Sequence, residues 1–73
     1  MPCYNHWTIE IPQMVYNESL KHKHAVPDEF LAEVFSASEL CGYGVYDTYC
    51  YEKLGNDGQM HYYCDYSTGT SCD

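Results

Sequence analysis

The strongest constraint on the fold of this chain is a glycine-rich turn between two tyrosine-rich runs. Residues 55–58 read Gly-Asn-Asp-Gly, and tyrosine favours strands, so residues 43–66 are predicted to form a β-hairpin. A three-residue loop of Asn56, Asp57 and Gly58, with Gly58 in the left-handed conformation of a bulge, is a common hairpin connection. A two-residue Asp57-Gly58 turn is the alternative, and it would shift the partner strand by one residue.

The three-residue loop decides which side chains share each face of the hairpin. One face then holds the pairs Leu54 with Met60, Glu52 with Tyr62, Cys50 with Cys64 and Thr48 with Tyr66. The other face holds Lys53 with His61, Tyr51 with Tyr63 and Tyr49 with Asp65, together with Asp47. The face with Leu54, Met60 and both cysteines is the more apolar. We therefore expect it to cover a helix and to leave the tyrosine face exposed.

The segment before residue 27 predicts one strand and one loop. Trp7, Ile9 and Ile11 alternate with polar residues, as in a strand with one buried face. Pro12 ends that strand because proline donates no ladder hydrogen bond. A continuation through residues 14–16, beyond a bulge, stays open. The polar residues 17–26 are predicted to form a loop.

Residues 27–40 predict the helix. Pro27 is tolerated in a first helical turn, where Asp28 and Glu29 complement the exposed amides. At 100° per residue the apolar side chains fall on one side and the carboxylates on the other. The apolar side is Phe30, Leu31, Val34, Phe35, Ala37 and Cys41, and the polar side is Asp28, Glu29, Glu33, Ser36 and Glu39.

A chain of 73 residues has room for one modest core. The predicted fold class is therefore α+β, with residues 1–73 as a single domain. One helix packs on a short antiparallel sheet in the order β-α-β-β. Residues 67–73 are small and polar and are predicted to form a loosely held tail.

The charge balance restricts the class of partner. Eleven acidic side chains face three lysines and no arginine, for a net charge of -8. Because cations that neutralise phosphates supply nucleic-acid affinity, direct binding to DNA, RNA or an anionic membrane is not expected. No apolar run is long enough to span a bilayer, and no leader-like start is seen. A protein with a Lys/Arg-rich surface is the partner that such a field attracts.

The cysteines and histidines do not form a recognisable cofactor or catalytic pattern. Five cysteines are an odd number without framework spacing, which favours reduced thiols in the cytoplasm. One or two disulfides in a secreted chain remain the alternative. The spacing of His61, Cys64 and Cys72, or of His22 and His24, is unconvincing for zinc. We expect no metal, no cofactor and no enzymatic activity.

Tyrosines and carboxylates are the candidate partner-binding residues. Nine of the 73 residues are tyrosine, a residue enriched at binding surfaces. Glu29 and Glu33 lie one helical turn apart, about 6 Å, close to the spacing of two phosphate steps along a duplex, about 6.8 Å. The candidate residues are Asp28, Glu29, Glu33, Glu39, Asp47, Tyr49, Tyr51, Tyr63 and Asp65.

A very small, acidic, arginine-free and tyrosine-rich chain with a helix against a β-hairpin resembles the inhibitors that bacteriophages make against host systems, anti-CRISPR proteins among them. The resemblance implies a stoichiometric inhibitor, active in the host cytoplasm, that occludes a basic surface of a nucleic-acid-handling complex. It implies no residue roles, because such proteins share no common fold. A small secreted, disulfide-stabilised effector domain and a zinc-stabilised adaptor stay open as alternatives.

Overall fold

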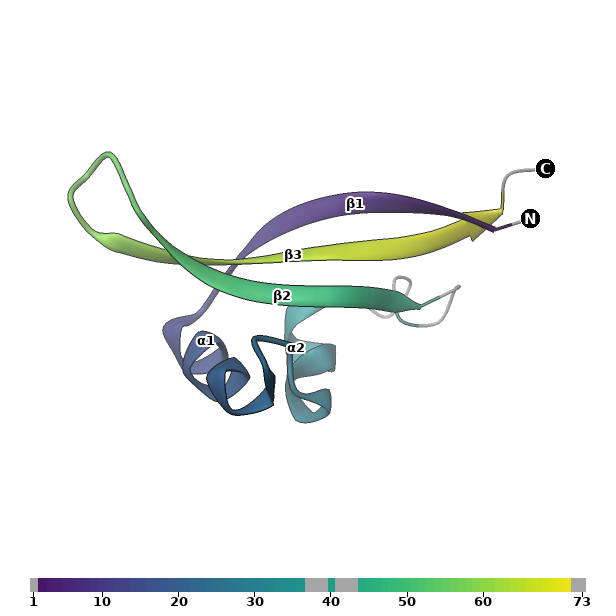
Figure 1. Cartoon of the computed structure of the whole chain (residues 1–73), viewed down its shortest axis with the longest axis horizontal. Coiled ribbons are helices and arrows are strands. Elements are labelled where there is room, and N and C mark those ends of the chain that lie inside the picture. The colour runs from purple at the N-terminus through teal and green to yellow at the C-terminus, as the bar shows by residue number, and fades with distance from the viewer. Residues whose placement is uncertain (1, 37–39, 41–43, 72–73) are drawn as a thin grey trace.

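Three antiparallel strands form one sheet with a helical layer on one side (Figure 1). The computed structural model describes residues 2–36, 40 and 44–71. The strands are β1 (Pro2–Ile11), β2 (Val45–Leu54) and β3 (Met60–Ser71), in the order β1-β3-β2. The predicted α+β class and its antiparallel sheet are confirmed, with the last strand at the centre.

The hairpin of β2 and β3 has the predicted three-residue loop. Gly58 has a φ of 80°, in the left-handed region. The Gly58 N–H donates to the Gly55 carbonyl at 3.1 Å, and the Gly55 N–H donates to the Gln59 carbonyl at 2.7 Å. Cys50 accordingly pairs with Cys64, and the tyrosine-face pairs also have the predicted register. The loop type fixes the register because it sets which residues face each other at the first ladder position.

The predicted pairing of Thr48 with Tyr66 is wrong, because β2 has a bulge there. Tyr46 pairs with Ser67 and Tyr49 pairs with Asp65, so Asp47 and Thr48 together face a single residue of β3. Asp47 takes a φ of 56°, a left-handed conformation that aspartate tolerates better than most residues. The Thr48 hydroxyl oxygen instead accepts a hydrogen bond from the Val26 N–H at 3.1 Å.

Residues 13–22 are helical, which corrects two predictions. The helix α1 (Gln13–Ser19) follows Pro12 directly and continues into the 3-10 helix η1 (Leu20–His22). Residues 14–16 therefore do not continue the strand, and residues 17–26 are only partly a loop. The helical segment ends where Lys23 turns left-handed at φ 55° and the His24 N–H reaches the Ser19 carbonyl at 2.8 Å.

The predicted helix over residues 27–40 is not continuous: it is interrupted at Phe35, and Leu40 is helical again, with its N–H donating to the Ser36 carbonyl at 3.1 Å. Pro27 precedes the 3-10 helix η2 (Asp28–Phe30), which leads into α2 (Leu31–Val34). Phe35 then has an extended backbone, with φ -115° and ψ 147°. The apolar pattern continues beyond Val34 because Phe35 enters the core from an extended chain. Residues 37–39, which belong to the predicted helix, and residues 41–43, which include Cys41 of its predicted apolar side, lie outside the described residues.

The chain ends are paired strands, so the prediction of a loose tail is wrong for residues 67–71. β1 begins at Pro2 and pairs with β3 without interruption, from Pro2 with Ser71 to Ile11 with Tyr62. Small residues such as Ser67 and Thr68 lie in this ladder because the other chain end supplies the partner strand. That long-range pairing is not encoded in the local composition of the tail.

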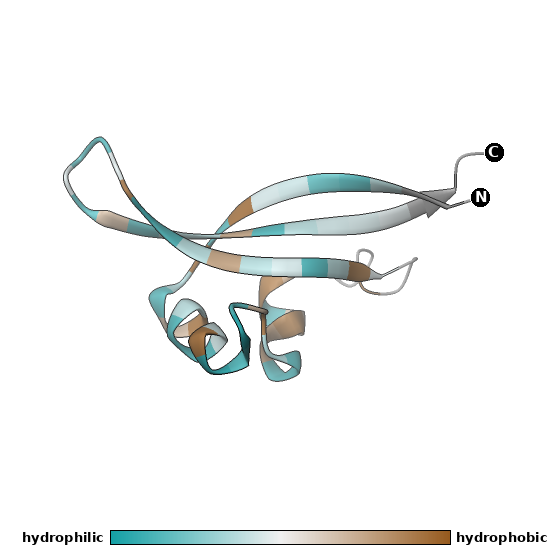
Figure 2. Cartoon of the chain, viewed as in Figure 1, coloured by the Kyte–Doolittle hydropathy of each residue, from teal (hydrophilic) through white to brown (hydrophobic). Residues whose placement is uncertain are grey.

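The core lies between the helical layer and the part of the sheet above it. Its buried residues are Ile11, Val15, Val26, Phe35, Cys50, Cys64 and Tyr66. Figure 2 shows apolar residues gathered in the helical layer, while the loop joining β2 to β3 is hydrophilic. Leu54 and Met60 were predicted to cover the helix, but they are 64% and 42% exposed because the hairpin tip extends beyond the helices (Figure 1).

Candidate functional site

In the described residues, no helix or strand covers the sheet surface that faces away from the helices (Figure 1). Because Ile9, Ile11 and Cys64 point into the core, the strand alternation places their neighbours on this other surface. We call it the open face. It consists of Tyr4, His6, Thr8 and Glu10 from β1, Tyr46, Tyr49, Tyr51 and Lys53 from β2, and His61, Tyr63, Asp65 and Ser67 from β3. Asp47, in the bulge of β2, is counted with it because it lines the same hollow as Asp65.

Asp65 occupies the centre of the open face and is held from both neighbouring strands. The Thr8 hydroxyl donates to Asp65 Oδ1 at 2.7 Å, and the Tyr51 hydroxyl donates to the same oxygen at 3.2 Å. Burial and then the negative charge of Asp65 raise the pKa of Tyr51, which keeps this phenol protonated as a donor. Within the described residues, Oδ2 of this exposed carboxylate has no hydrogen-bond partner and is available to an external cation.

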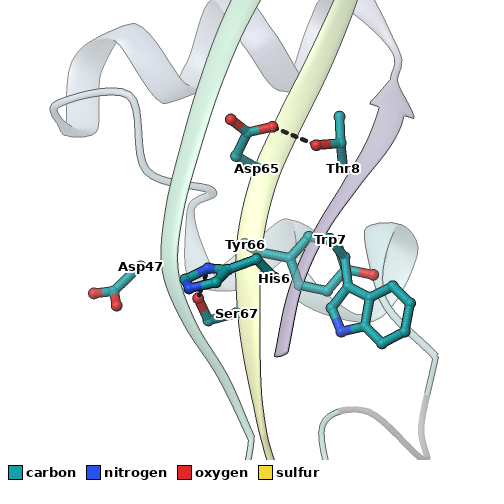
Figure 3. A pocket seen from close by; sticks show the side chains of 7 residues that line it. All are labelled: His6, Trp7, Thr8, Asp47, Asp65, Tyr66 and Ser67. Atoms are coloured by element: carbon teal, nitrogen blue, oxygen red, sulfur yellow. Dashed lines mark hydrogen bonds between the residues drawn. The ribbon is translucent and has the colours of Figure 1, made fainter. Parts of the chain in front are cut away.

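An open hollow of about 450 Å³ lies next to Asp65. Its lining residues are His6, Trp7, Thr8, Asp47, Asp65, Tyr66 and Ser67. Figure 3 shows Thr8 joined to Asp65 and His6 beside Ser67, with 2.8 Å between the Ser67 oxygen and His6 Nδ1. The bulge brings the exposed carboxylate of Asp47 to the rim of the same hollow as Asp65.

At the tip of the sheet a histidine lies between two carboxylates. His61 Nδ1 is 3.2 Å from Glu10 Oε2, and His61 Nε2 is 3.1 Å from Asp57 Oδ2. Hydrogen bonds to Asp57 and then to Glu10 raise the pKa of His61. The Gln59 main chain and then His61 lower the pKa of Asp57. Lys53 is the remaining cation of this end of the open face.

The tyrosines of the open face form contacting pairs. Tyr51 and Tyr63 lie with ring centroids 5.8 Å apart, and Tyr4 meets Tyr46 edge-on at the same distance. Tyr49 is 51% exposed and stacks at 5.0 Å on His24, which reaches it around the edge of β2. Tyr49 is exposed and Tyr51 and Tyr63 are half-buried, so the predicted tyrosines form a partly exposed and partly pre-ordered aromatic surface around Asp65.

The predicted carboxylates do not form one surface. Asp28 and Glu29 are exposed in η2 and Glu33 is exposed in α2, all within the helical layer. Asp47 and Asp65 line the hollow on the other side of the sheet. Glu39 lies outside the described residues. The helical layer also carries Lys21, which contacts Glu18 at 3.4 Å.

The described candidate zinc ligands His61 and Cys64 are not brought together, and Cys72 lies outside the described residues. His61 projects from the open face, whereas Cys64 lies in the core on the opposite side of β3. Among the residues described by the structure, no group of three or more possible ligands could hold a metal ion. Cys50 and Cys64 are buried free thiols that face each other across the hairpin. No helix within the described ranges is long and apolar enough to cross a membrane.

The contribution of β1 to the open face was missing from the sequence interpretation. Tyr4, His6, Thr8 and Glu10 alternate with the inward residues of β1, so the period of the strand indicates that they share one face. The missing information was the sheet order, which places Thr8 beside Asp65 and Glu10 beside Tyr63.

Comparison with known proteins adds no relative to this description. No family model, no curated protein and no solved structure matches the chain. The arguments about function therefore depend on the geometry of the open face.

Proposed function

We propose that this protein is an inhibitor that binds a larger protein by placing its open face on a Lys/Arg-rich surface that handles nucleic acid. The observation that carries the proposal is the uncovered sheet surface on which Asp65 and Asp47 lie among exposed tyrosines. A face of this composition, with no layer over it, matches the aromatic and polar character of protein-binding surfaces.

Charge supports a basic partner. The open face and the hairpin loop carry the carboxylates Glu10, Asp47, Asp57 and Asp65 against one lysine, Lys53, and the histidines His6 and His61. A partner arginine could bind the available oxygen of Asp65 without displacing Thr8 or Tyr51. Such charge-assisted hydrogen bonds are about twice as strong as neutral ones. The tyrosine rings around Asp65 would stack on guanidinium planes and shield the contact from water.

The mechanism follows from competition for the same cations. A surface that binds phosphates presents lysine and arginine side chains that are unpaired until nucleic acid arrives. The acidic open face would neutralise those side chains and block access, with no reaction catalysed. Small phage inhibitors of host systems, including anti-CRISPR proteins, are the class whose action this resembles.

The test begins with capture of partners from a bacterial lysate on immobilised chain and continues with the purified partner. Nucleic acid should compete with the chain for that partner, and affinity should fall as salt rises. Tyr49→Ala should speed dissociation about tenfold or more, as loss of an exposed anchor does. Leu54→Ala is the control, since Leu54 is also exposed, at 64%, and lies on the other face of β2. Simultaneous binding of nucleic acid and this chain would overturn the proposal.

A second candidate, a secreted disulfide-stabilised domain, has one observation in its favour. Cys50 and Cys64 face each other as a cross-strand pair, at a separation that a disulfide can span. The thiol measurement described in the Discussion separates this candidate from a cytoplasmic inhibitor.

A further inference from the structure

The two outer edges of the sheet differ in how they are protected. The edge of β2 is covered at Cys50, whose N–H donates to the His24 carbonyl at 2.6 Å. The ring nitrogen Nδ1 of His24 lies 3.0 Å from the Cys50 carbonyl oxygen. A bulge between Tyr46 and Tyr49 further disturbs that edge. Coverage and bulges are the usual means by which proteins block strand addition.

The edge of β1 presents a row of unpaired main-chain groups. Because the N–H and C=O of Cys50 point toward His24, Cys50 and Cys64 are a non-hydrogen-bonded pair. Cys64 therefore directs its own main-chain groups to Ile9 of β1. By alternation, the even-numbered residues Tyr4, His6, Thr8 and Glu10 direct theirs outward. In the part of the chain that the structure describes, those groups have no main-chain partner.

Nothing on β1 blocks the addition of a strand. Residues 2–9 contain no lysine, arginine, aspartate or glutamate, and prolines stand only at the two ends, at Pro2 and Pro12. The β1–β3 ladder has no bulge. The helix α1 packs on β2 and β3, so the helical layer leaves the outer side of β1 clear (Figure 1). Uncharged, regular and aromatic edges of this kind are templates for pairing.

We propose that the occupant of this edge is a second copy of the chain, whose β1 pairs with β1 in antiparallel orientation to make one continuous sheet. Even-numbered residues must then face even-numbered residues. With Thr8 on the two-fold axis, His6 faces Glu10 of the second copy, which sets an imidazole donor against a carboxylate. On the other face of the strand, Trp7, 51% exposed, meets Ile9 of the second copy as an apolar cross-strand pair.

A basic peptide is the competing occupant, but β1 has few charged groups that would bind it. The single charged side chain of the strand other than histidine is Glu10. A copy of the same neutral strand provides complementary hydrogen bonds and apolar contacts. Each copy carries a net charge of -8, so association should strengthen as salt screens the repulsion. This salt dependence has the opposite sign from that of binding to a basic partner. A result can therefore contradict the dimer without contradicting the proposed function, and the reverse.

The decisive measurement is residue-resolved hydrogen exchange of the wild-type chain at about 10 µM and about 1 mM, beside sedimentation equilibrium. The amides of His6, Thr8 and Glu10 should gain protection with concentration, about tenfold or more. The outward amides of Glu52 and Leu54 on the β2 edge should not. A monomer at every concentration in about 0.5 M salt would overturn the proposal. Protection gained at the β2 edge instead, or gained only on adding an oligoarginine probe, would also overturn it.

Two variants test the contact, so that the result does not depend on a single variant that fails to fold. Trp7→Lys puts an ammonium group at the apolar pair and should weaken dimerisation about tenfold. Leu54→Lys is the matched control, since it makes the same charge change at an exposed site on the other edge. His6→Pro removes an outward N–H and leaves the main-chain bonds to β3 intact, although the side-chain contact with Ser67 is lost. If both edge variants dimerise like Leu54→Lys while remaining folded by circular dichroism, β1 is not the interface.

Discussion

His61 lies between Asp57 and Glu10, and this position makes its protonation part of the stability of the fold. Hydrogen bonds to both carboxylates raise its pKa above the ordinary value of 6.5. Its contribution is therefore complete below about pH 6.5 and is lost as the pH rises through the folded value. The lowered pKa of Asp57 affects stability at acidic pH. Its contribution is complete above its ordinary pKa of 3.8 and is lost as the pH falls through the lowered folded value.

We predict that the melting temperature is highest between about pH 4 and pH 6.5 and declines above that range. His61→Gln should remove most of the decline on the alkaline side, because glutamine does not titrate. The measurement is thermal unfolding followed by circular dichroism from about pH 4 to pH 8. His22→Gln is the control, since the exposed His22 has no carboxylate contact within the described residues. An unchanged alkaline decline in His61→Gln would contradict the assignment.

Cys50 and Cys64 are fully buried, and their contact affects both thiols. The hydrogen bond with Cys50, followed by burial, raises the pKa of Cys64. The same hydrogen bond lowers the pKa of Cys50 to about 7. We predict that both are reduced and resist alkylation until the protein unfolds, because neither sulfur is accessible to a reagent. Rapid trapping followed by peptide mass spectrometry, before and after denaturation, measures this. A Cys50–Cys64 disulfide in protein isolated from cells would favour the secreted alternative.

At the scale of elements, the hairpin turn depends on one glycine. Gly58 has a φ of 80°, and a Cβ added there would meet no atom within 4 Å other than those of its chain neighbours. A substitution therefore costs conformational energy without a clash. Gly58→Ala should lower the free energy of unfolding by about 1 kcal/mol. Gly58→Asn should cost less, because asparagine tolerates the left-handed region. Urea unfolding measures both, and equal losses in the two variants would contradict this explanation.

The hairpin could be predicted from sequence, but the helices could not be bounded. The loop 56–58 fixes the register of its neighbours through local geometry alone. α1 was missed because its buried side consists of Val15 and the polar Ser19, which do not form an apolar stripe. The interruption of the helix after Pro27 was missed because periodicity does not distinguish a helical Phe35 from an extended one that packs against Tyr66 at 4.7 Å.

The candidate site, like the fold, was predicted only in part. The pairing of Tyr49 with Asp65 and the exposure of that face followed from the hairpin register. The support of Asp65 by Thr8 joins residues 57 positions apart in the chain. Such contacts depend on the sheet order, which local patterns do not specify. Likewise, no turn signal in the sequence indicated the bulge that places Asp47 at the hollow.

For the whole molecule, charge predicts what will not bind. Eleven acidic side chains against three lysines repel phosphates, so the chain should show no binding to plain duplex DNA or RNA at physiological salt. The measurement is fluorescence anisotropy with labelled duplexes up to about 100 µM protein. Sub-micromolar affinity for either duplex would contradict the charge argument and remove the basis for a basic partner.

The two groups of carboxylates lie on opposite sides of the sheet, so a flat partner surface can contact one group at a time. We predict that the pair Asp47→Asn with Asp65→Asn lowers partner affinity about tenfold or more, mainly by faster dissociation. The pair Glu29→Gln with Glu33→Gln makes the same net charge change in the helical layer. It should slow association slightly and leave dissociation unchanged, because those side chains would act only through the long-range field.

Surface plasmon resonance at about 0.05 and 0.5 M salt, where the screening length falls from roughly 14 to 4 Å, separates the two effects. At low salt both pairs should slow association to a similar degree. At high salt the helical pair should approach wild type, while the open-face pair keeps its fast dissociation because direct contacts are screened least. If the two pairs behave alike at both salt concentrations, net charge alone governs binding, and the open face is not the contact surface.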